Sequence, residues 1–381
     1  MYNPSFFLGA LGSGGLSVTF FLMLMFWIPH PNQPIPVFED WMNVMVSGTL
    51  FNKAVVSLAL MGIAILSITH FKLLVKNLKK WSEFKKTDHY KEFVNQGSGI
   101  TQMAVYLTLA MSINAAFIVG AIFVPNLWSV VEYLFPLAVI AFALVGFFAV
   151  KAYAGIVVVQ NSGKGVTGSK ITLLPAFAFS MISVGFAAPA AMSHIQDVQA
   201  ISTLLSLFFA SLAGWVVFQN LGSSYRSIHQ DGIDDMALPT LWIMIPVLTI
   251  LMIAGIRLEH GMHNFCVSGC EGNGVPTSAL VLGIIFFMQT AMLFTGYMTK
   301  RSVNFFERIK NGEFNVPATY GLICPGVAYA VSLHFFINKG LVASHFIEKF
   351  GVVYWSLSAI AVGIALFTLK FYVDLLRRIE K

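Results

Sequence analysis

The chain has 381 residues, of which 57% are hydrophobic and only 10% are charged. A soluble globular domain carries about a quarter charged residues, so this composition argues against a soluble fold. The net charge of +6 does not indicate a nucleic-acid partner, because the basic residues lie at the ends of apolar runs, as in membrane anchoring. We expect a single transmembrane domain over residues 1–381, with the lipid bilayer as its surroundings.

Ten stretches are apolar for about 20 residues, which is the length that crosses roughly 30 Å of hydrocarbon as a helix. Helices are expected because each span must satisfy its own backbone hydrogen bonds in lipid. The predicted fold class is an all-α integral membrane protein with ten transmembrane helices. The predicted spans are Phe6–Ile28, Ala54–Leu74, Met103–Val124, Leu127–Val150, Ile171–Ser193, Ile201–Phe218, Leu238–Ile256, Ser278–Thr299, Val316–Asn338 and Val352–Leu369.

The distribution of basic residues predicts how the spans are oriented. Nearly all of the 23 Lys and Arg residues follow even-numbered spans. The exceptions are Lys53, Arg257, Lys339 and Lys349. Because basic residues concentrate on the cytoplasmic side of a membrane protein, both termini are expected in the cytoplasm. The predicted localisation is the cell inner (plasma) membrane, with multiple passes.

Helix-breaking and small residues recur in the odd-numbered spans. Prolines open the fifth, seventh and ninth spans, and the first span contains a cluster of glycines around Gly12. Pro246 and Pro325 follow inside their spans, where proline is expected to kink a helix. Helices of this kind either line a cavity or pack on protein. We favour the first interpretation, in which five helical hairpins place their odd-numbered helices around a central pore.

Two segments, LPTLWIMIPVLT (Leu238–Thr249) and VPATYGLICPGVAYA (Val316–Ala330), resemble the tellurite-resistance/dicarboxylate transporter family, which includes bacterial relatives of plant slow-type anion channels. Weaker similarity in LLPAFAFSMISVGFAAPA and FFLGALGSGGLSVTF extends the resemblance over nearly the whole chain. The resemblance implies quasi-fivefold hairpins, a homotrimer with one pore in each protomer, and permeation by small anions. It also implies a phenylalanine gate before a proline of the ninth span, where this chain has Cys324. Phe179 or Tyr320 could take the place of that aromatic ring.

The candidate pore-lining residues lie on odd-numbered spans: Gly12, Asn114, Phe179, Pro246, Tyr320, Cys324 and Pro325. Cys324 is equally compatible with a small buried apolar residue. No Asp, Glu, Lys or Arg is evident in the middle of a span, and His70 and His334 are interpreted as interfacial. A proton-coupled transporter usually needs a buried titratable group. We therefore favour an anion channel or uniporter, with a small inorganic or organic anion as its partner. The alternative is a proton-coupled exporter of dicarboxylate, sulfite or another oxyanion.

The loop RLEHGMHNFCVSGCEGNG follows the seventh span and is predicted to face the outside. A Cys266–Cys270 disulfide is favoured there, because exported loops meet an oxidising compartment. Free thiols, or a tetrahedral zinc held by His260, His263, Cys266 and Cys270, are the alternatives. A metal-responsive sensor is therefore a third functional hypothesis. No enzyme motif is found, and neither enzymatic activity nor a cofactor is expected.

Overall fold

The structure is a computed structural model that describes residues 2–31, 33–164, 170–231, 235–265 and 275–380. Ten helices within these residues are long and apolar enough to cross a membrane, so the predicted class of ten membrane helices is confirmed. Their helical cores are α1 (Phe7–Trp27), α3 (Leu50–Phe84), α5 (Met103–Phe123), α6 (Val131–Val159), α7 (Leu174–Met192), α8 (Gln196–Asp231), α9 (Met244–Phe265), α10 (Val275–Ser302), α12 (Ile323–Phe335) and α13 (Val352–Ile379).

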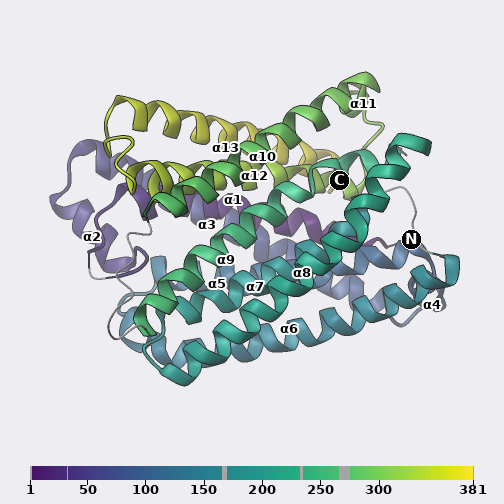
Figure 1. Cartoon of the computed structure of the whole chain (residues 1–381), viewed down its shortest axis with the longest axis horizontal. Coiled ribbons are helices and arrows are strands. Elements are labelled where there is room, and N and C mark those ends of the chain that lie inside the picture. The colour runs from purple at the N-terminus through teal and green to yellow at the C-terminus, as the bar shows by residue number, and fades with distance from the viewer. Residues whose placement is uncertain (1, 32, 165–169, 232–234, 266–274, 381) are drawn as a thin grey trace.

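The ten helices run side by side along the long axis of the bundle (Figure 1). Both chain termini lie toward one end, called here the termini end. The short helix α2 (Phe38–Ser47) lies at the other, called the loop end. The short helices α4 (Asp88–Val94) and α11 (Phe305–Lys310) lie between consecutive spans. Helix α3 continues past its predicted end at Leu74 to Phe84 and includes Lys76, Lys79 and Lys80.

Five of the spans are buried inside the bundle and five cover them. In the most apolar part of α1, α5, α7, α9 and α12, between 50% and 89% of the residues are buried, against 22% to 33% in the other five spans. Helix α1 contacts α5 and α12, α7 contacts α5 and α9, and α9 contacts α12. These five, called the inner helices, therefore form a closed ring of contacts. They are the odd-numbered spans of the chain.

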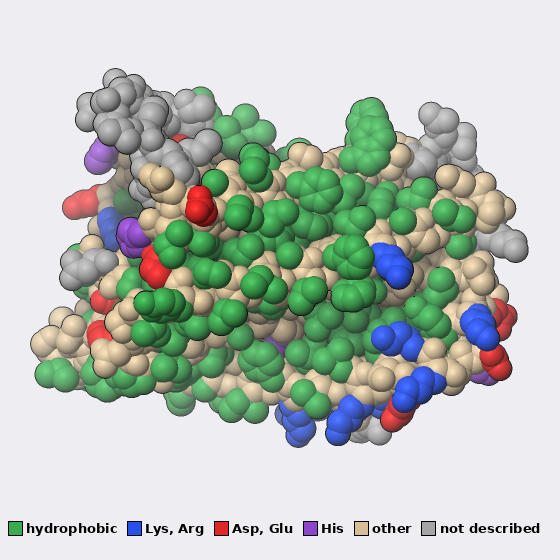
Figure 2. Space-filling model, turned by 90° about the horizontal axis from the view of Figure 1, so that it is seen from below, with side chains coloured by type: hydrophobic (Ala, Val, Ile, Leu, Met, Phe, Trp, Pro, Cys, Tyr) green, Lys and Arg blue, Asp and Glu red, His purple; other side chains and the backbone are tan. Residues whose placement is uncertain are grey.

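The outer five spans expose large apolar side chains, as a lipid-facing surface requires. Examples are Ile68 of α3, Phe147 of α6 and Phe287 of α10, each more than 60% exposed. Figure 2 shows hydrophobic side chains covering the middle of one face, with Lys and Arg gathered mainly toward the termini end. The chain is therefore a multi-pass membrane protein whose outer helices meet the lipid.

Each inner span begins at the termini end with a short 3₁₀ segment. These segments are Pro4–Phe6, Gly97–Gln102, Lys170–Leu173, Asp235–Trp242 and Pro317–Leu322. Pro246 and Pro325 are the third residues of α9 and α12. They therefore lie in the first α-helical turn, where proline is tolerated. The expected kink within a long α-helix is replaced by a change from 3₁₀ to α-helical geometry.

The glycines of α1 let α12 approach closely. An added Cβ would come within 3.1–3.2 Å of a side chain of the 3₁₀–α12 segment at three positions: Gly9 against Tyr320, Gly12 against Ile323, and Gly15 against Val327. Small residues at such spacing are typical of tightly packed membrane helices. The glycine-rich first span thus has a packing role that the pore interpretation alone did not include.

His70 of α3 is buried between α1 and α5, so the prediction that it is interfacial is wrong. Its Nδ1 lies 2.7 Å from the carbonyl oxygen of Ala10, and its Nε2 lies 2.8 Å from Oγ of Ser112. Because a carbonyl only accepts hydrogen bonds, Nδ1 carries a proton. His334 of α12 is also buried, at 2% exposed. Both imidazoles belong to the protein interior.

Gly14 provides a test of this packing, because a Cβ added there would lie 2.8 Å from Nδ1 of His70. We expect Gly14→Ala to lower the melting temperature of the purified protein in detergent, since overpacking costs about 1–3 kcal/mol. Gly363→Ala on α13 is the matched control, because its Cβ would meet nothing within 4 Å. That control should keep or raise the melting temperature. An unchanged value for Gly14→Ala would show that His70 is not held in this position.

Candidate functional site

A cavity of about 1070 Å³ lies among the inner helices. Each inner helix contributes residues to its wall. Residues of α6 join the wall beside α5 and α7, and the segment before α2 contributes His30, Gln33, Pro34 and Ile35. The cavity reaches the surface at the loop end, because two of its lining residues there, His260 and Lys349, are exposed.

The cavity extends from the loop end to about the middle of the bundle. Its lining residues nearest the termini end, one on each inner helix, are Leu11, Met111, Phe177, Pro246 and Cys324. On α1 the lining runs from Leu11 to Phe26, a length of roughly 22 Å at 1.5 Å per residue. A bilayer core is roughly 30 Å thick. Beyond this deep end the inner helices carry buried side chains such as Phe7 and Tyr320.

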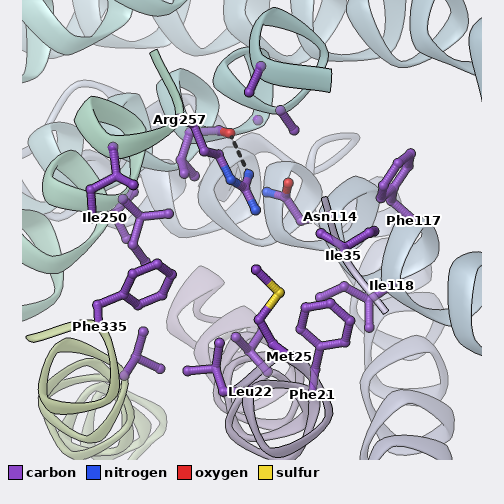
Figure 3. Close-up of a pocket in the computed structure, with 18 of the residues that line it drawn as sticks. Phe21, Leu22, Met25, Ile35, Asn114, Phe117, Ile118, Ile250, Arg257 and Phe335 are labelled. Atoms are coloured by element: carbon purple, nitrogen blue, oxygen red, sulfur yellow. Dashed lines mark hydrogen bonds between the residues drawn. The ribbon is translucent and has the colours of Figure 1, made fainter. Parts of the chain in front are cut away.

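The wall is mainly aliphatic and aromatic. Figure 3 shows Phe21, Leu22 and Met25 of α1 opposite Arg257, with Phe117 and Ile118 of α5 on one side and Ile250 and Phe335 on the other. Ligand pockets of this kind use a few placed polar groups to orient what they bind. The polar groups of the wall therefore decide its chemistry.

Arg257 of α9 places a guanidinium group in this apolar wall. Its Nη1 donates a hydrogen bond to the carbonyl oxygen of Val184 at 3.2 Å. No described carboxylate lies within ion-pair distance of it. Figure 3 shows the guanidinium and the amide of Asn114 directed toward each other. Since guanidinium carries five N–H donors and stays charged, Arg257 offers the cavity a charge and several free donors among the described residues.

Asn114 of α5 is held in position by its own helix. Its amide nitrogen donates to the carbonyl oxygen of Ala110 at 3.2 Å and lies 3.8 Å from the sulfur of Met181. The side chain lines the cavity and is only partly buried. Asn114 of α5 and Arg257 of α9 therefore form a pair of polar groups on the two inner helices that flank α7.

The other side chains in the wall that can carry a positive charge are lysines and histidines. They lie at the loop end: His30, His260, Lys339 and Lys349. No Asp or Glu among the described residues lines the cavity. Three acids near this end hold backbone or loops instead: Glu39 accepts from the Asn126 amide, Asp40 from the Val37 amide, and Glu132 from Ser193 and His194. The described lining at this end therefore carries basic and imidazole side chains and no carboxylate, while Glu259 and Glu348 are the chain neighbours of His260 and Lys349.

Comparisons of the chain with protein-family models, with curated proteins and with solved structures found no match. The likeness to the tellurite-resistance/dicarboxylate transporter family stays a proposal. Any function has to be inferred from the chemistry of the cavity.

Four of the seven candidate pore residues line this cavity: Gly12, Asn114, Pro246 and Cys324. Phe179, Tyr320 and Pro325 do not. Phe179 packs against Tyr153 and Phe209, with ring centroids 5.4 and 6.1 Å away. Tyr320 is fully buried and lies 6.4 Å from the ring of Tyr372. Neither ring therefore faces the cavity, and the aromatic side chain of α7 at its deep end is Phe177.

Sequence reasoning missed Arg257, Lys339 and Lys349 as residues of the site. A signal was present, because these are three of the four basic residues that break the charge bias. Lys339 lies in the π-helical segment Phe336–Val342 that continues α12. Such segments occur often at functional sites. The fourth exception, Lys53, does not line the cavity and donates to the carbonyl oxygen of Val46 at 3.3 Å.

The predicted Cys266–Cys270 disulfide lies outside the described residues, as does the side chain of His263. His260 is described, and its Nδ1 lies 2.9 Å from the carbonyl oxygen of Ile256. Among the described residues no group of three or more His, Cys, Asp and Glu side chains could hold a metal. The disulfide, the free thiols and the zinc alternative all remain predictions.

Proposed function

We propose that the protein is a membrane anion channel or uniporter that passes small anions through the ring of inner helices. The observation that carries this proposal is a cavity inside a ten-span bundle whose described lining contains Arg, Lys and His but no Asp or Glu, and whose guanidinium has no described carboxylate partner. A cleft of one charge sign with low-dielectric walls concentrates ions of the opposite sign. The termini end would face the cytoplasm and the open half of the cavity the outside. The homotrimer implied by the resemblance belongs to the same proposal.

Reconstitution into liposomes tests this function directly. Chloride, nitrate and acetate should enter protein-containing liposomes faster than empty ones, and potassium should not. The reversal potential should follow the anion gradient alone. Anion entry equal to that of empty liposomes, under either sign of membrane potential, would reject the proposal.

A proton-coupled exporter of dicarboxylate, sulfite or another oxyanion is the second candidate. It is favoured by two buried imidazoles in or beside the inner ring, His70 and His334. Nδ1 of His334 has no hydrogen-bond partner among the described residues, so no hydrogen bond at that atom fixes its protonation state. A reversal potential that shifts with the pH gradient, and no longer shifts in His334→Gln, would select the exporter over the channel.

The lysines at the cavity mouth should attract anions over a distance. We expect the double variant Lys339→Gln/Lys349→Gln to lower chloride flux roughly threefold to tenfold at low salt, since steering of this kind changes entry rates by about tenfold or more. The loss should shrink at high ionic strength, where the Debye length falls to about 3 Å. Lys53→Gln is the matched control and should conduct as the wild type. A loss that is independent of salt would contradict an electrostatic role.

A further inference from the structure

The cavity is larger and more apolar than an inorganic anion requires. Its volume of about 1070 Å³ reaches the upper end of the range for pockets that enclose drug-sized ligands, roughly 300–1,000 Å³. A bare anion in the deep half would lose hydration without gaining donors. The hydroxyl of Thr249, one of the few polar groups there, already bonds to the carbonyl oxygen of Ala328 at 3.1 Å and to Gln289 at 2.9 Å.

The apolar part has the shape of an elongated compartment with Arg257 at one end. Along α7, the lining runs from Val184, whose carbonyl accepts from the guanidinium, to Phe177 at the deep end, a distance of roughly 10 Å at 1.5 Å per residue. Aliphatic side chains cover this length on neighbouring helices, among them Leu22, Ile250, Ile253, Val327 and Val331. Beside α5 and α7, residues of α6 complete the wall of the compartment. An apolar body longer than a two-carbon acid would bury its surface against these side chains.

The polar end matches a single acidic head group. Arg257 presents a planar fork of donors, which suits the two oxygens of a carboxylate. The amide of Asn114 is directed at the same place (Figure 3). With one guanidinium and no other cation in the deep half of the lining, a second negative charge there would be buried without a partner.

We propose that the cavity selects a monoanionic organic acid with an apolar body, a chain-bearing monocarboxylate, whose head group binds Arg257 and Asn114 and whose body lies toward Cys324. This inference rests on the proposed anion function and names the substrate class of that same site. The basic mouth attracts the acid, the guanidinium orients it, and the apolar wall distinguishes it from inorganic anions and dianions.

A chain-length series tests the inference on the full-length protein in nanodiscs of neutral lipid. Acetate, butyrate, hexanoate and octanoate are titrated by isothermal calorimetry, with flux measured for the same acids in liposomes. Affinity should rise by up to about fourfold for each added methylene, the factor that corresponds to about 0.8 kcal/mol per buried CH₂. Octanoate should bind at least tenfold more tightly than suberate, the dicarboxylate of equal length. Equal affinities along the series, or suberate binding as tightly as octanoate, would overturn the inference.

Two variants test the direction of the bound acid. Arg257→Gln should weaken octanoate at least tenfold and leave the neutral analogue octanol unaffected. Cys324→Phe, which fills the deep end, should weaken the binding of octanoate by a larger factor than the binding of butyrate. Weakening of both acids by the same factor would show that the apolar body of the acid does not lie toward Cys324. The wild-type series does not depend on either variant being stable, so the inference remains falsifiable if one fails to fold.

The remaining outcomes distinguish a free acid from a lipid as the occupant of the cavity. They also distinguish a failure of this inference from a failure of the proposed function. A short-chain phosphatidic acid is a lipid that also joins an anionic head group, here a phosphate, to apolar chains. If it binds and octanoate does not, the free acid is excluded as the occupant. If nitrate and acetate move through the protein while octanoate neither binds nor moves, this inference fails and the proposed function stands. If none of these anions binds or moves, the proposed function fails as well.

Discussion

Arg257→Gln should lower anion flux into liposomes at least tenfold. Hydrogen bonds to a charged group contribute about 1.5–3 kcal/mol, which corresponds to roughly tenfold to hundredfold in affinity. Glutamine keeps a donor and much of the side-chain length but removes the charge and the fork. The effect is measured as the initial rate of chloride or acetate entry at a fixed membrane potential, with the amount of reconstituted protein equalised.

Arg257→Lys provides the graded comparison for this prediction. Lysine keeps the charge at the site but presents a point charge in place of the planar fork, so its flux should lie between those of wild type and Arg257→Gln. Arg257 makes one hydrogen bond with the described residues, so neither variant should lower the melting temperature greatly. Wild-type flux in Arg257→Gln would remove this residue from the anion path.

Cys324→Phe should reduce flux at least tenfold by filling the deep end of the cavity. Cys324 is only 8% exposed and lines the deep end of the cavity. A phenyl ring at this position has no space except toward the cavity or into a packed helix contact. Flux is measured for a panel of anions of increasing size, and the largest anion should be affected most.

Two controls keep this result interpretable. Ala359→Phe adds the same ring to an exposed position of α13 away from the cavity lining, and should conduct as the wild type. Overpacking costs about 1–3 kcal/mol, so the melting temperature of Cys324→Phe is measured beside its flux. A stable Cys324→Phe protein with unchanged flux for every anion would show that the path does not pass Cys324.

The ten spans were predictable because hydrocarbon thickness demands long apolar runs, and few other folds contain ten of them. The division into inner and outer helices was also visible in the sequence. Small residues and prolines recur in the odd-numbered spans, and these are the spans the structure buries. The physical reason for the small residues differs in part from the prediction, because Gly9, Gly12 and Gly15 also allow α1 to lie close against α12.

The face that each inner helix turns to the cavity could not be predicted. A helix buried on all sides is apolar in every direction and carries no period that marks one face. Phe177 and Phe179 differ by two residues, which is about 200° around an α-helix. Only Phe177 lines the cavity. Cys324 and Pro325 are neighbours, about 100° apart around their helix, and only Cys324 lines the cavity.

Arg257 was overlooked for a different reason. It follows directly after Ile256, the last residue of its predicted span, so hydropathy alone places it outside the membrane helix and among the exceptions to the charge bias. The cavity wall around it includes residues of the segment before α2 and of the π-helical segment after α12, and neither contribution is visible in hydropathy. The exceptions to the charge bias were the better guide, because a basic residue on the opposite side needs another reason to be there.

The 3₁₀ segment Pro317–Leu322, just before α12, gives the closed half of the bundle a specific geometric freedom. Its six residues rise about 2.0 Å each and turn about 120° each, against about 1.5 Å and 100° in an α-helix. Rewinding them as an α-helix would draw α12 about 3 Å toward the termini end and rotate it by about 120°. A screw motion of that size would exchange Cys324 for a different residue at the floor of the cavity, and it would separate Ile323 and Val327 from the glycines of α1 against which they pack.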